Sequence, residues 1–306
     1  MTDLYRLAVI SQNDKPQVIV EKSGKYLPID TVLEGEVARK IGTNGPLDLA
    51  FLLEDWAGWN AMLDRYVTKN ASLFDSGGEP VEQLKFEAPL AAPGKIICIG
   101  SNFHDHIAEM AIPMTPSYPY SFIKPTNNTV RGSGDAVAKP KKAELFDWEA
   151  ELGVVIGKQC VDVSKEDALS VVAGYVNFND LSCRDWLASR PPVGVDWVQH
   201  KAFDGFAPFG PYLVPAEFVP DVQDMPMRLD VNGVTKQDSS TAQMVFGVAD
   251  IIAHLTSIMT LMPGDIIATG TPAGVGHGAK PPQYLKAGDV VEIEIGDLGR
   301  LVTPIV

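Results

Sequence analysis

The stretches FDWEAELGVVIG (146–157) and VVAGYVNFNDLSCRDW (171–186) decide how this chain is interpreted. Both are rich in apolar and β-branched residues, so they predict two consecutive strands. Glu149 and Glu151 stand two residues apart, a spacing that directs both side chains to one face of a strand. Asp180 follows the second run at the point where it ends. The pattern therefore predicts that three carboxylates meet.

A cation is the physical requirement of such a cluster. Carboxylates that converge in a partly buried place repel one another and lose hydration, which raises their pKa values unless a cation is present. Ligation by oxygen alone suits Mg²⁺ or Mn²⁺, with Ca²⁺ possible, and disfavours Zn²⁺ and copper. The spacing of Glu149 and Glu151 alone favours the solvated face of an edge strand. The sequence downstream favours the metal site.

Composition excludes several classes of partner. The formal net charge of −14 over 306 residues lacks the basic footprint that nucleic acid or an anionic membrane would require. The N-terminus shows no secretory signal, and no apolar run approaches the roughly 20 residues of a membrane span. The three cysteines, Cys98, Cys160 and Cys183, are widely spaced and indicate buried thiols. We therefore expect a cytoplasmic protein that binds neither nucleic acid nor membrane.

The chain divides into two expected domains. Residues 4–30 alternate apolar and polar positions around turn residues, as in a small antiparallel sheet, and 47–67 have helical periodicity. A segment rich in Gly, Pro and Glu at 74–94 indicates a linker. We place a small N-terminal α+β domain at 1–80 and a larger domain at 81–306. From Lys95 onward, short strands dominate, which favours a mixed α+β fold over a doubly wound parallel sheet.

A histidine and a glutamate follow the first strand of the larger domain. In GSNFHDHIAEM (100–110), a short helix over 103–110 would place His106 and Glu109 on one face. The carboxylate could then fix the imidazole tautomer and raise its basicity, so that the pair draws a proton from water. A surface pair without function is the open alternative. Two Pro-rich stretches, 112–120 and 190–192, are expected to form loops near the site.

Further candidates lie downstream. Lys201 would stabilise an enolate or bind a substrate oxygen if it projects into the carboxylate cluster. Arg184 would pair with Asp185 or bind the substrate. The Gly-rich stretch DIIATGTPAGVG (265–276), with the hydroxyl of Thr271, suits a carboxylate or another small anion. It lacks the lysine of a P-loop and the helix of a dinucleotide fingerprint, which disfavours nucleotide binding.

The order of these motifs is more specific than any one of them. GSNFHDHIAEM (100–110) is followed by SFIKP (121–125), DWEAELGVVIG (147–157), NDLSCRDW (179–186), KAFDGFAPFGP (201–211) and ATGTPAGVG (268–276). From about Lys95 to the C-terminus, this series closely resembles the fumarylacetoacetate hydrolase family. It is similar to members of the acylpyruvase and 2-hydroxyhepta-2,4-diene-1,7-dioate isomerase type. The resemblance implies a strand-rich mixed β roll or sandwich as the catalytic domain.

The resemblance also implies roles for individual residues. At positions matching the family's motifs stand the metal ligands Glu149, Glu151 and Asp180, the catalytic residues His106, Glu109 and Lys201, and the substrate-binding residues Gly270 and Thr271. To the substrate-binding group we add Arg184. Phe103 departs conservatively from the tyrosine that is common after the asparagine in the family.

The implied activity is cleavage of a carbon–carbon bond in a β-diketo, acylpyruvate-type 2-oxo acid. We expect a Mg²⁺- or Mn²⁺-dependent hydrolase in which His106, oriented by Glu109, deprotonates water and the metal stabilises the departing enolate. Isomerisation of a hydroxymuconate-type dienoate or decarboxylation of oxaloacetate would use the same site. A metal-stabilised binding protein without turnover is a further alternative. The resemblance also implies a homodimer and a place in aromatic catabolism.

Overall fold

The computed structural model describes residues 4–33, 48–81, 84–110, 115–188 and 194–306. Of the two expected loops, residues 112–114 and 190–192 lie outside these ranges. None of the described helices combines the length and apolarity needed to cross a membrane.

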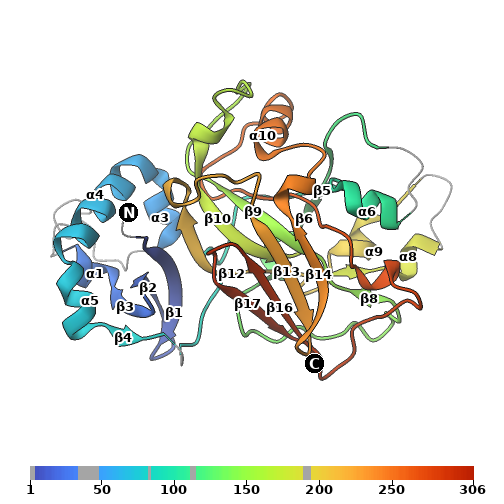
Figure 1. The fold of residues 1–306 in the computed structure, drawn as a ribbon, viewed down its shortest axis with the longest axis horizontal. Coiled ribbons are helices and arrows are strands. Elements are labelled where there is room, and N and C mark those ends of the chain that lie inside the picture. Colours follow the sequence, from blue (N-terminus) through green and yellow to red (C-terminus); the bar gives the residue numbers. More distant parts are fainter. Residues whose placement is uncertain (1–3, 34–47, 82–83, 111–114, 189–193) are drawn as a thin grey trace.

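Strands outnumber helices among the described residues, and Figure 1 shows how these elements are arranged. The strands are β1 (Arg6–Gln12), β2 (Lys15–Lys22), β3 (Lys25–Pro28), β4 (Glu79–Pro80), β5 (Ile96–Gly100), β6 (Tyr120–Lys124), β7 (Val130–Arg131), β8 (Phe146–Asp147), β9 (Ala150–Ile156), β10 (Val172–Asn179), β11 (Ser182–Cys183), β12 (Ala207–Pro215), β13 (Pro226–Val231), β14 (Val234–Ser240), β15 (Ile266–Ala268), β16 (Val290–Ile295) and β17 (Arg300–Pro304). The α-helices are α1 (Ile29–Val32), α3 (Leu49–Glu54), α4 (Trp56–Lys69), α5 (Ala71–Gly77), α6 (His104–Glu109), α7 (Thr126–Thr129), α8 (Asp185–Ala188), α9 (Trp197–Lys201) and α10 (Val248–Thr256). Short 3₁₀ turns are η1 (Ala168–Val171), η2 (Ala216–Phe218), η3 (Thr241–Gln243) and η4 (Gly276–Gly278).

One large sheet organises the molecule. Its strands run in the order β4-β3-β2-β1-β12-β10-β9-β15-β5-β6, with β7 paired to β12. Neighbours on this path are antiparallel except β15 and β5, and β7 is parallel to β12. The central strands β9, β10 and β12 are buried along their whole lengths. Strands covered on both faces read as continuous apolar runs, which explains why β9 shows no alternation in the sequence.

The two faces of this sheet carry separate cores. Along β5, Ile97 and Ile99 belong to one buried cluster, and Ile96 and Cys98 belong to the other, as the two-residue period of a strand requires. The first cluster includes the inner residues of α10 and of a second, four-stranded sheet, β14-β13-β16-β17. The second cluster includes the buried residues of α3 and α4. Each face of the large sheet is thus covered by a different layer.

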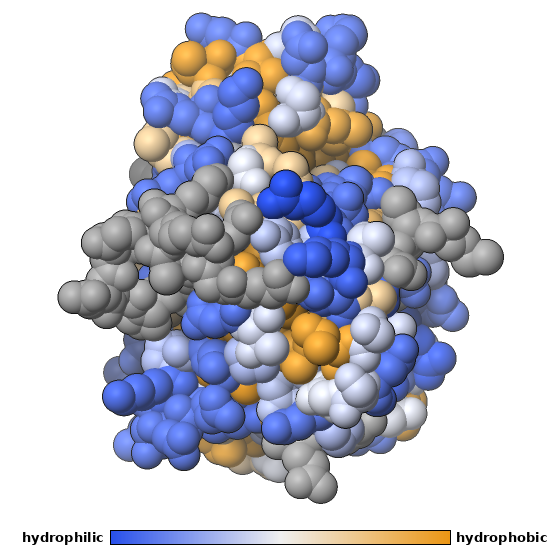
Figure 2. All heavy atoms as spheres, turned by 90° about the vertical axis from the view of Figure 1, so that its left-hand side faces the viewer, coloured by the Kyte–Doolittle hydropathy of each residue, from blue (hydrophilic) through white to orange (hydrophobic). Residues whose placement is uncertain are grey.

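The N-terminal strands continue the large sheet. The expected antiparallel strands over residues 4–30 are present as β1, β2 and β3, and β1 pairs with β12 through Leu7–Leu213 and Ala8–Tyr212. Helices α1, α3, α4 and α5 gather beside them at one end of the molecule (Figure 1). Hydrophilic side chains predominate on the described part of that end (Figure 2). The strand-rich α+β class is confirmed, and the domain boundary at residue 80 stays a prediction.

One local expectation needs correction. The expected linker at 74–94 includes the end of α5 and β4, which pairs with β3, so part of it is regular structure.

Lys201 is the last residue of helix α9. Asp196 caps this helix, because its carboxylate accepts hydrogen bonds from the backbone N–H groups of Val198 and Gln199. The cap fixes where α9 begins and leaves Lys201 buried at its last turn.

Candidate metal centre and active site

Glu149, Glu151 and Asp180 come together. Glu149 immediately precedes β9, Glu151 lies within it, and Asp180 directly follows the neighbouring strand β10. One carboxylate oxygen from each lies within 4.8 Å of the others, and all three residues are buried. The convergence predicted from the sequence is therefore present, and it arises where antiparallel strands place the start of β9 beside the end of β10.

Three buried cations surround this cluster. Lys201 Nζ donates to Glu149 Oε2 at 2.8 Å and to Asp180 Oδ2 at 2.6 Å. Arg184 donates to Glu149 Oε1, and Lys124 donates to Asp180 Oδ1. Since the positive and negative charges are equal in number among these six groups, the cluster can be buried without a large uncompensated charge.

The environments of the two glutamates differ. Burial alone would raise the pKa of Glu149, but the Lys201 and Arg184 charges outweigh burial and hold that pKa below its ordinary value. Burial and the charges of Asp180 and Glu149 raise the pKa of Glu151 well above its ordinary value, against the effects of Lys201 and of a hydrogen bond from the Gly270 N–H. Glu151 is thus the carboxylate most in need of an additional positive charge.

The residues fit a hard divalent cation. The donor set consists of carboxylate oxygens only, which suits Mg²⁺, Mn²⁺ or Ca²⁺. Each ionised carboxylate oxygen has more than one lone pair, so an oxygen that accepts a hydrogen bond can also ligate. A divalent ion would satisfy the need of Glu151 for positive charge. Among the described residues, this is the group of three acidic, His or Cys side chains close enough to hold an ion.

Arg184 is held between two carboxylates. Its Nε donates to Asp147 Oδ2 at 2.9 Å, and its terminal nitrogen donates to Glu149. Asp147 is fully buried, and its Oδ1 also accepts the Gly276 N–H at 2.7 Å while its Oδ2 accepts the His277 N–H at 3.0 Å. The guanidinium lines the same cavity as the carboxylates. Arg184 therefore orients Glu149, and its role as a substrate-binding residue stays a prediction.

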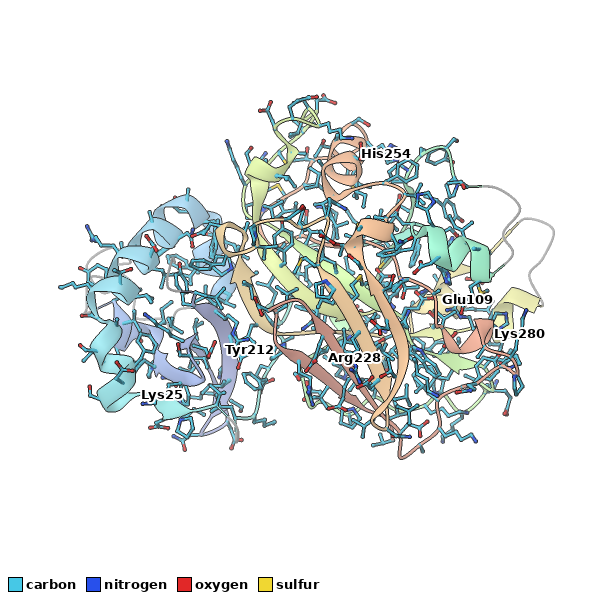
Figure 3. All side chains as sticks on the ribbon, viewed as in Figure 1. Lys25, Glu109, Tyr212, Arg228, His254 and Lys280 are labelled. Carbon is cyan, nitrogen blue, oxygen red and sulfur yellow. The ribbon has the colours of Figure 1, made fainter. Side chains whose placement is uncertain are left out.

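His106 and Glu109 lie near each other on α6, but His106 Nδ1 and Glu109 Oε2 form no hydrogen bond. His106 Nδ1 lies 3.6 Å from Glu109 Oε2, and His106 is buried. Glu109 Oε1 accepts the Gly274 N–H at 2.9 Å, and Asp105 Oδ2 accepts a hydrogen bond from Ser239 at 2.7 Å. These two bonds attach α6 to the turn after β15 and to β14. Figure 3 labels Glu109 beside α6, at the end of the molecule away from the N-terminal helices.

The turn after β15 supports Glu151. The Gly270 N–H donates to Glu151 Oε2 at 2.9 Å, so in this structure it serves a carboxylate of the protein. Gly270 has φ +99°, and a Cβ there would lie 2.8 Å from Asn102 Cβ, so the position demands glycine. Thr271 Oγ1 accepts a hydrogen bond from Gln237 at 2.8 Å. Substrate binding by Gly270 and Thr271 stays a prediction.

A cavity of about 450 Å³ connects these groups. Glu149, Glu151, Asp180, Arg184, Lys201, His106 and Thr271 all line it. Three aromatic residues line it as well: Trp197 of α9 stacks on Phe122 of β6 with ring centroids 4.2 Å apart, and Tyr120 packs against Trp197. The Nζ of Lys201 lies 5.5 Å from the centroid of the Phe122 ring, so these rings adjoin the charged cluster.

His200 also lines the cavity, and sequence reasoning did not select it. It is 1% exposed, and its Nδ1 has no hydrogen-bond partner among the described residues. Burial, together with the nearby charges of Lys201 and Arg184, lowers its pKa to about 2 against the opposing effect of Glu149. His200 is therefore a neutral imidazole at physiological pH.

Sequence reasoning also missed Lys124, Asp147 and Gln237. Lys124 is the fourth residue of SFIKP and the last residue of β6, and it is fully buried. The sequence signal for its role was a lysine within an apolar strand. Lysine is almost never fully buried unless it is paired, so such a lysine indicates a buried acidic partner. Asp147 carried the same signal between two aromatic residues. Gln237 gave no local signal, since its role depends on the contact between two sheets.

The fold and the site together define a class of protein. It is a strand-rich α+β protein in which an all-oxygen candidate metal centre, a lysine and a His–Glu pair surround one cavity. The family described as "Fumarylacetoacetate (FAA) hydrolase C-terminal" matches residues 95–306. The chain therefore belongs to the fumarylacetoacetate hydrolase family.

Relatives of this chain have more than one named activity. It is 45% identical over 223 residues to a 2,4-didehydro-3-deoxy-L-rhamnonate hydrolase from Sphingomonas sp. (strain SKA58), covering 72% of this chain and 75% of the relative. It is 44% identical over 219 residues to a mitochondrial oxaloacetate tautomerase from Xenopus laevis, covering 72% and 67%. The solved structure of maleylpyruvate hydrolase from Sphingobium sp. SYK-6, in complex with manganese(II) and pyruvate, is 27% identical with a TM-score of 0.75 and covers 98% of both chains. The family thus includes hydrolases and a tautomerase.

Proposed function

We propose that this protein is a divalent-metal-dependent hydrolase that cleaves a carbon–carbon bond in a β-diketo, acylpyruvate-type 2-oxo acid. The observation that carries the proposal is that His106 lines the same cavity as the three carboxylates and Lys201. A metal-stabilised binding protein would need the carboxylates but would have no use for a histidine paired with a glutamate at the same cavity.

Glu149, Glu151 and Asp180 would hold Mg²⁺ or Mn²⁺, with Ca²⁺ possible. When bound, the ion supplies Lewis-acid polarisation of the 2-oxo group and stabilises enolate charge. His106 accepts a proton from the attacking water, and the nearby Glu109 carboxylate stabilises the imidazolium that results. Lys201, whose pKa is raised by Asp180 and Glu149 despite the opposing effect of burial, stays charged and compensates negative charge that develops on the substrate.

The names of two relatives support this choice. The Sphingomonas relative is a hydrolase of a 2,4-didehydro-3-deoxy sugar acid, and a β-diketo acid carries its two carbonyl groups at those same positions, 2 and 4. The Sphingobium structure binds manganese(II) and pyruvate, and pyruvate is the product expected from an acylpyruvate.

The test is the turnover of acetylpyruvate and fumarylpyruvate by the purified protein with Mg²⁺ and after chelation. We expect His106→Ala to lower kcat by about 10²- to 10⁴-fold, the range for loss of a general base, with metal affinity kept. His104→Ala is the matched control, because His104 lies on the same helix and is exposed. An unchanged rate after chelation, or a wild-type kcat in His106→Ala, contradicts the proposal.

Isomerisation is the second candidate, and the Xenopus relative named as an oxaloacetate tautomerase favours it. Proton transfer between carbon and oxygen would use His106 without water attack. Product analysis with oxaloacetate, a hydroxymuconate-type dienoate and acetylpyruvate separates tautomerisation, decarboxylation and hydrolysis. The 2-oxo acid substrate is tested by these measurements, and the homodimer stays a separate prediction.

A further inference from the structure

Gln237 connects the start of strand β9, where Glu149 and Glu151 lie, to the turn that carries Thr271. It lies in β14 of the four-stranded sheet and is fully buried. Its Oε1 accepts the backbone N–H of Ala150 at 2.9 Å, between Glu149 and Glu151. Its Nε2 donates to Thr271 Oγ1 and to the backbone oxygen of Pro272, both at 2.8 Å. One side chain therefore spans both sides of the candidate site.

The orientation of this amide is fixed by its neighbours. The Ala150 N–H can only donate, and the Pro272 carbonyl oxygen can only accept. If the amide were rotated by half a turn, Nε2 would face a donor and Oε1 would face an acceptor, and two buried hydrogen bonds would be lost. The side-chain nitrogen must therefore face Thr271.

This orientation determines what Thr271 does. A threonine hydroxyl has one proton to donate, and here its oxygen accepts from Gln237. No described residue accepts the Thr271 proton in a hydrogen bond of this structure, and Thr271 lines the cavity beside the carboxylates. The hydroxyl is therefore left to donate into the cavity, where a carboxylate or keto oxygen would accept the bond.

We propose that Gln237 is a positioning residue that makes Thr271 a hydrogen-bond donor to the carboxylate of a 2-oxo acid. The inference rests on the proposed function, because the 2-oxo acid is the ligand that this function requires. Gln237 does not line the cavity, so it acts on the substrate through Thr271. Its second bond, to Ala150, holds the backbone between two candidate metal ligands, so one residue fixes the spacing between metal and carboxylate sites.

The test is a double-mutant cycle with oxalate binding in Mg²⁺ as the readout, measured by calorimetry. Thr271→Val removes the hydroxyl and keeps the shape, and we expect the oxalate Kd to rise about tenfold, as for one lost hydrogen bond. Gln237→Glu replaces the donor by an acceptor, which would draw the Thr271 proton away from the cavity and raise the Kd by a similar factor. In the Thr271→Val background, Gln237→Glu should add less than about threefold, because its route to the ligand is gone.

The controls separate positioning from folding. Gln243→Glu makes the same change at an exposed residue in η3 and should leave the oxalate Kd and the Tm unchanged. Thr271→Ser restores a hydroxyl and should restore affinity relative to Thr271→Val. If Gln237→Glu does not fold, Gln237→Met takes its place in the cycle, since it removes the donor without adding charge. Steady-state kinetics of Gln237→Glu should show a raised KM for acylpyruvates, with kcat within about threefold of wild type.

The outcomes distinguish this inference from the proposed function. If the wild-type protein shows no Mg²⁺-dependent binding of oxalate, the proposed function fails, and this inference fails with it. If the wild type binds oxalate and Gln237→Glu binds it equally well, the role of Gln237 alone is overturned. Fully additive effects of the Gln237 and Thr271 substitutions would likewise show that Gln237 does not act through Thr271.

Discussion

At the scale of single residues, Glu149 and Glu151 show how two similar side chains acquire different roles. Glu149 bonds to Arg184 and Lys201, whereas Glu151 receives one backbone N–H from Gly270. The pKa of Glu149 is lowered and the pKa of Glu151 is raised. In the metal-free protein, Glu149 therefore stabilises the fold as an anion, while Glu151 is costly as one.

Replacing each glutamate by glutamine should therefore have opposite effects on the metal-free protein. Glu149→Gln removes one carboxylate partner of Arg184 and Lys201 and should lower the free energy of unfolding by about 3 kcal/mol. We expect no larger loss, because Asp147 still bonds to Arg184 and Asp180 still bonds to Lys201. Glu151→Gln resembles the protonated acid and should leave that free energy unchanged or raise it. Denaturant unfolding in EDTA measures both values.

Mg²⁺ binding should respond differently. Both variants should lose more than about 100-fold in affinity, since substitutions of residues that only support a ligand already cost 10- to 100-fold. Calorimetry and the rise of Tm with Mg²⁺ measure this loss. Equal destabilisation of both metal-free variants, or wild-type Mg²⁺ affinity in Glu151→Gln, would contradict the assigned environments.

His200 should make stability depend on acid pH. The folded protein keeps it neutral down to a pKa of about 2, whereas the unfolded chain protonates it near its ordinary value of 6.5. Its contribution is fully present above pH 6.5 and is lost as the pH falls, because only the unfolded state takes up the proton. The loss is about 1.4 kcal/mol per pH unit below that value.

The measurement compares the free energy of unfolding at pH 7 and pH 5 in wild type and in His200→Gln. The variant should lose about 2 kcal/mol less than wild type over this interval. His104→Gln, at an exposed histidine, is the control and should follow wild type. A parallel pH dependence in wild type and His200→Gln would show that the pKa of His200 in the folded protein equals its value in the unfolded chain.

At the scale of elements, Asp147 joins segments that are distant in sequence. It ends β8, holds Arg184 just after β11, and accepts N–H groups from Gly276 and His277 in η4. The turn before η4 bonds to Glu109 through Gly274. Asp147 thereby connects the surroundings of Glu149 with those of the His–Glu pair.

Asp147→Asn should consequently lower both the stability of the protein and its catalytic activity. The substitution removes a buried negative charge next to Arg184, and we expect a loss of about 3 kcal/mol in stability with at least a tenfold loss in kcat/KM for an acylpyruvate. Asp238→Asn, at an exposed aspartate of β14, is the matched control. Stability is measured by denaturant unfolding and kcat/KM by initial rates. Unchanged values for Asp147→Asn would show that the network is dispensable.

The same scale explains what the sequence could predict. Strand periodicity and the two-residue spacing of Glu149 and Glu151 sufficed to predict that carboxylates meet near Asp180, because strand geometry is local. Lys124 reaches Asp180 only because β6 pairs with β5, and β5 lies beside β15 and β9 in the large sheet. Gln237 depends on the packing of two sheets. Such contacts are set by the order of strands, which one sequence does not display.

At the scale of the whole molecule, the large sheet unites the parts that the sequence divides at residue 80. Strand β1 pairs with β12, and Arg6 lies over the ring of Tyr212 at 4.1 Å from its centroid. Figure 3 shows Tyr212 where the N-terminal strands meet the rest of the molecule. One buried cluster contains residues from α3 and α4 together with Val176 and Phe178 of β10. The described residues of the first 80 therefore contribute to the same buried cluster as the strand that leads to Asp180.

A chain that begins at residue 81 should consequently fail to fold as a soluble monomer. It would expose the edge of β12 that pairs with β1 and the part of the buried cluster to which α3 and α4 contribute. An open apolar strand edge promotes aggregation. Size-exclusion chromatography and thermal unfolding of this variant, beside the full-length chain, measure the outcome. Removing residues 1–3 only, which precede β1, is the control and should leave Tm unchanged. A monomeric 81–306 variant that unfolds cooperatively and binds Mg²⁺ would show instead that the catalytic part is an independent domain, as the sequence predicts.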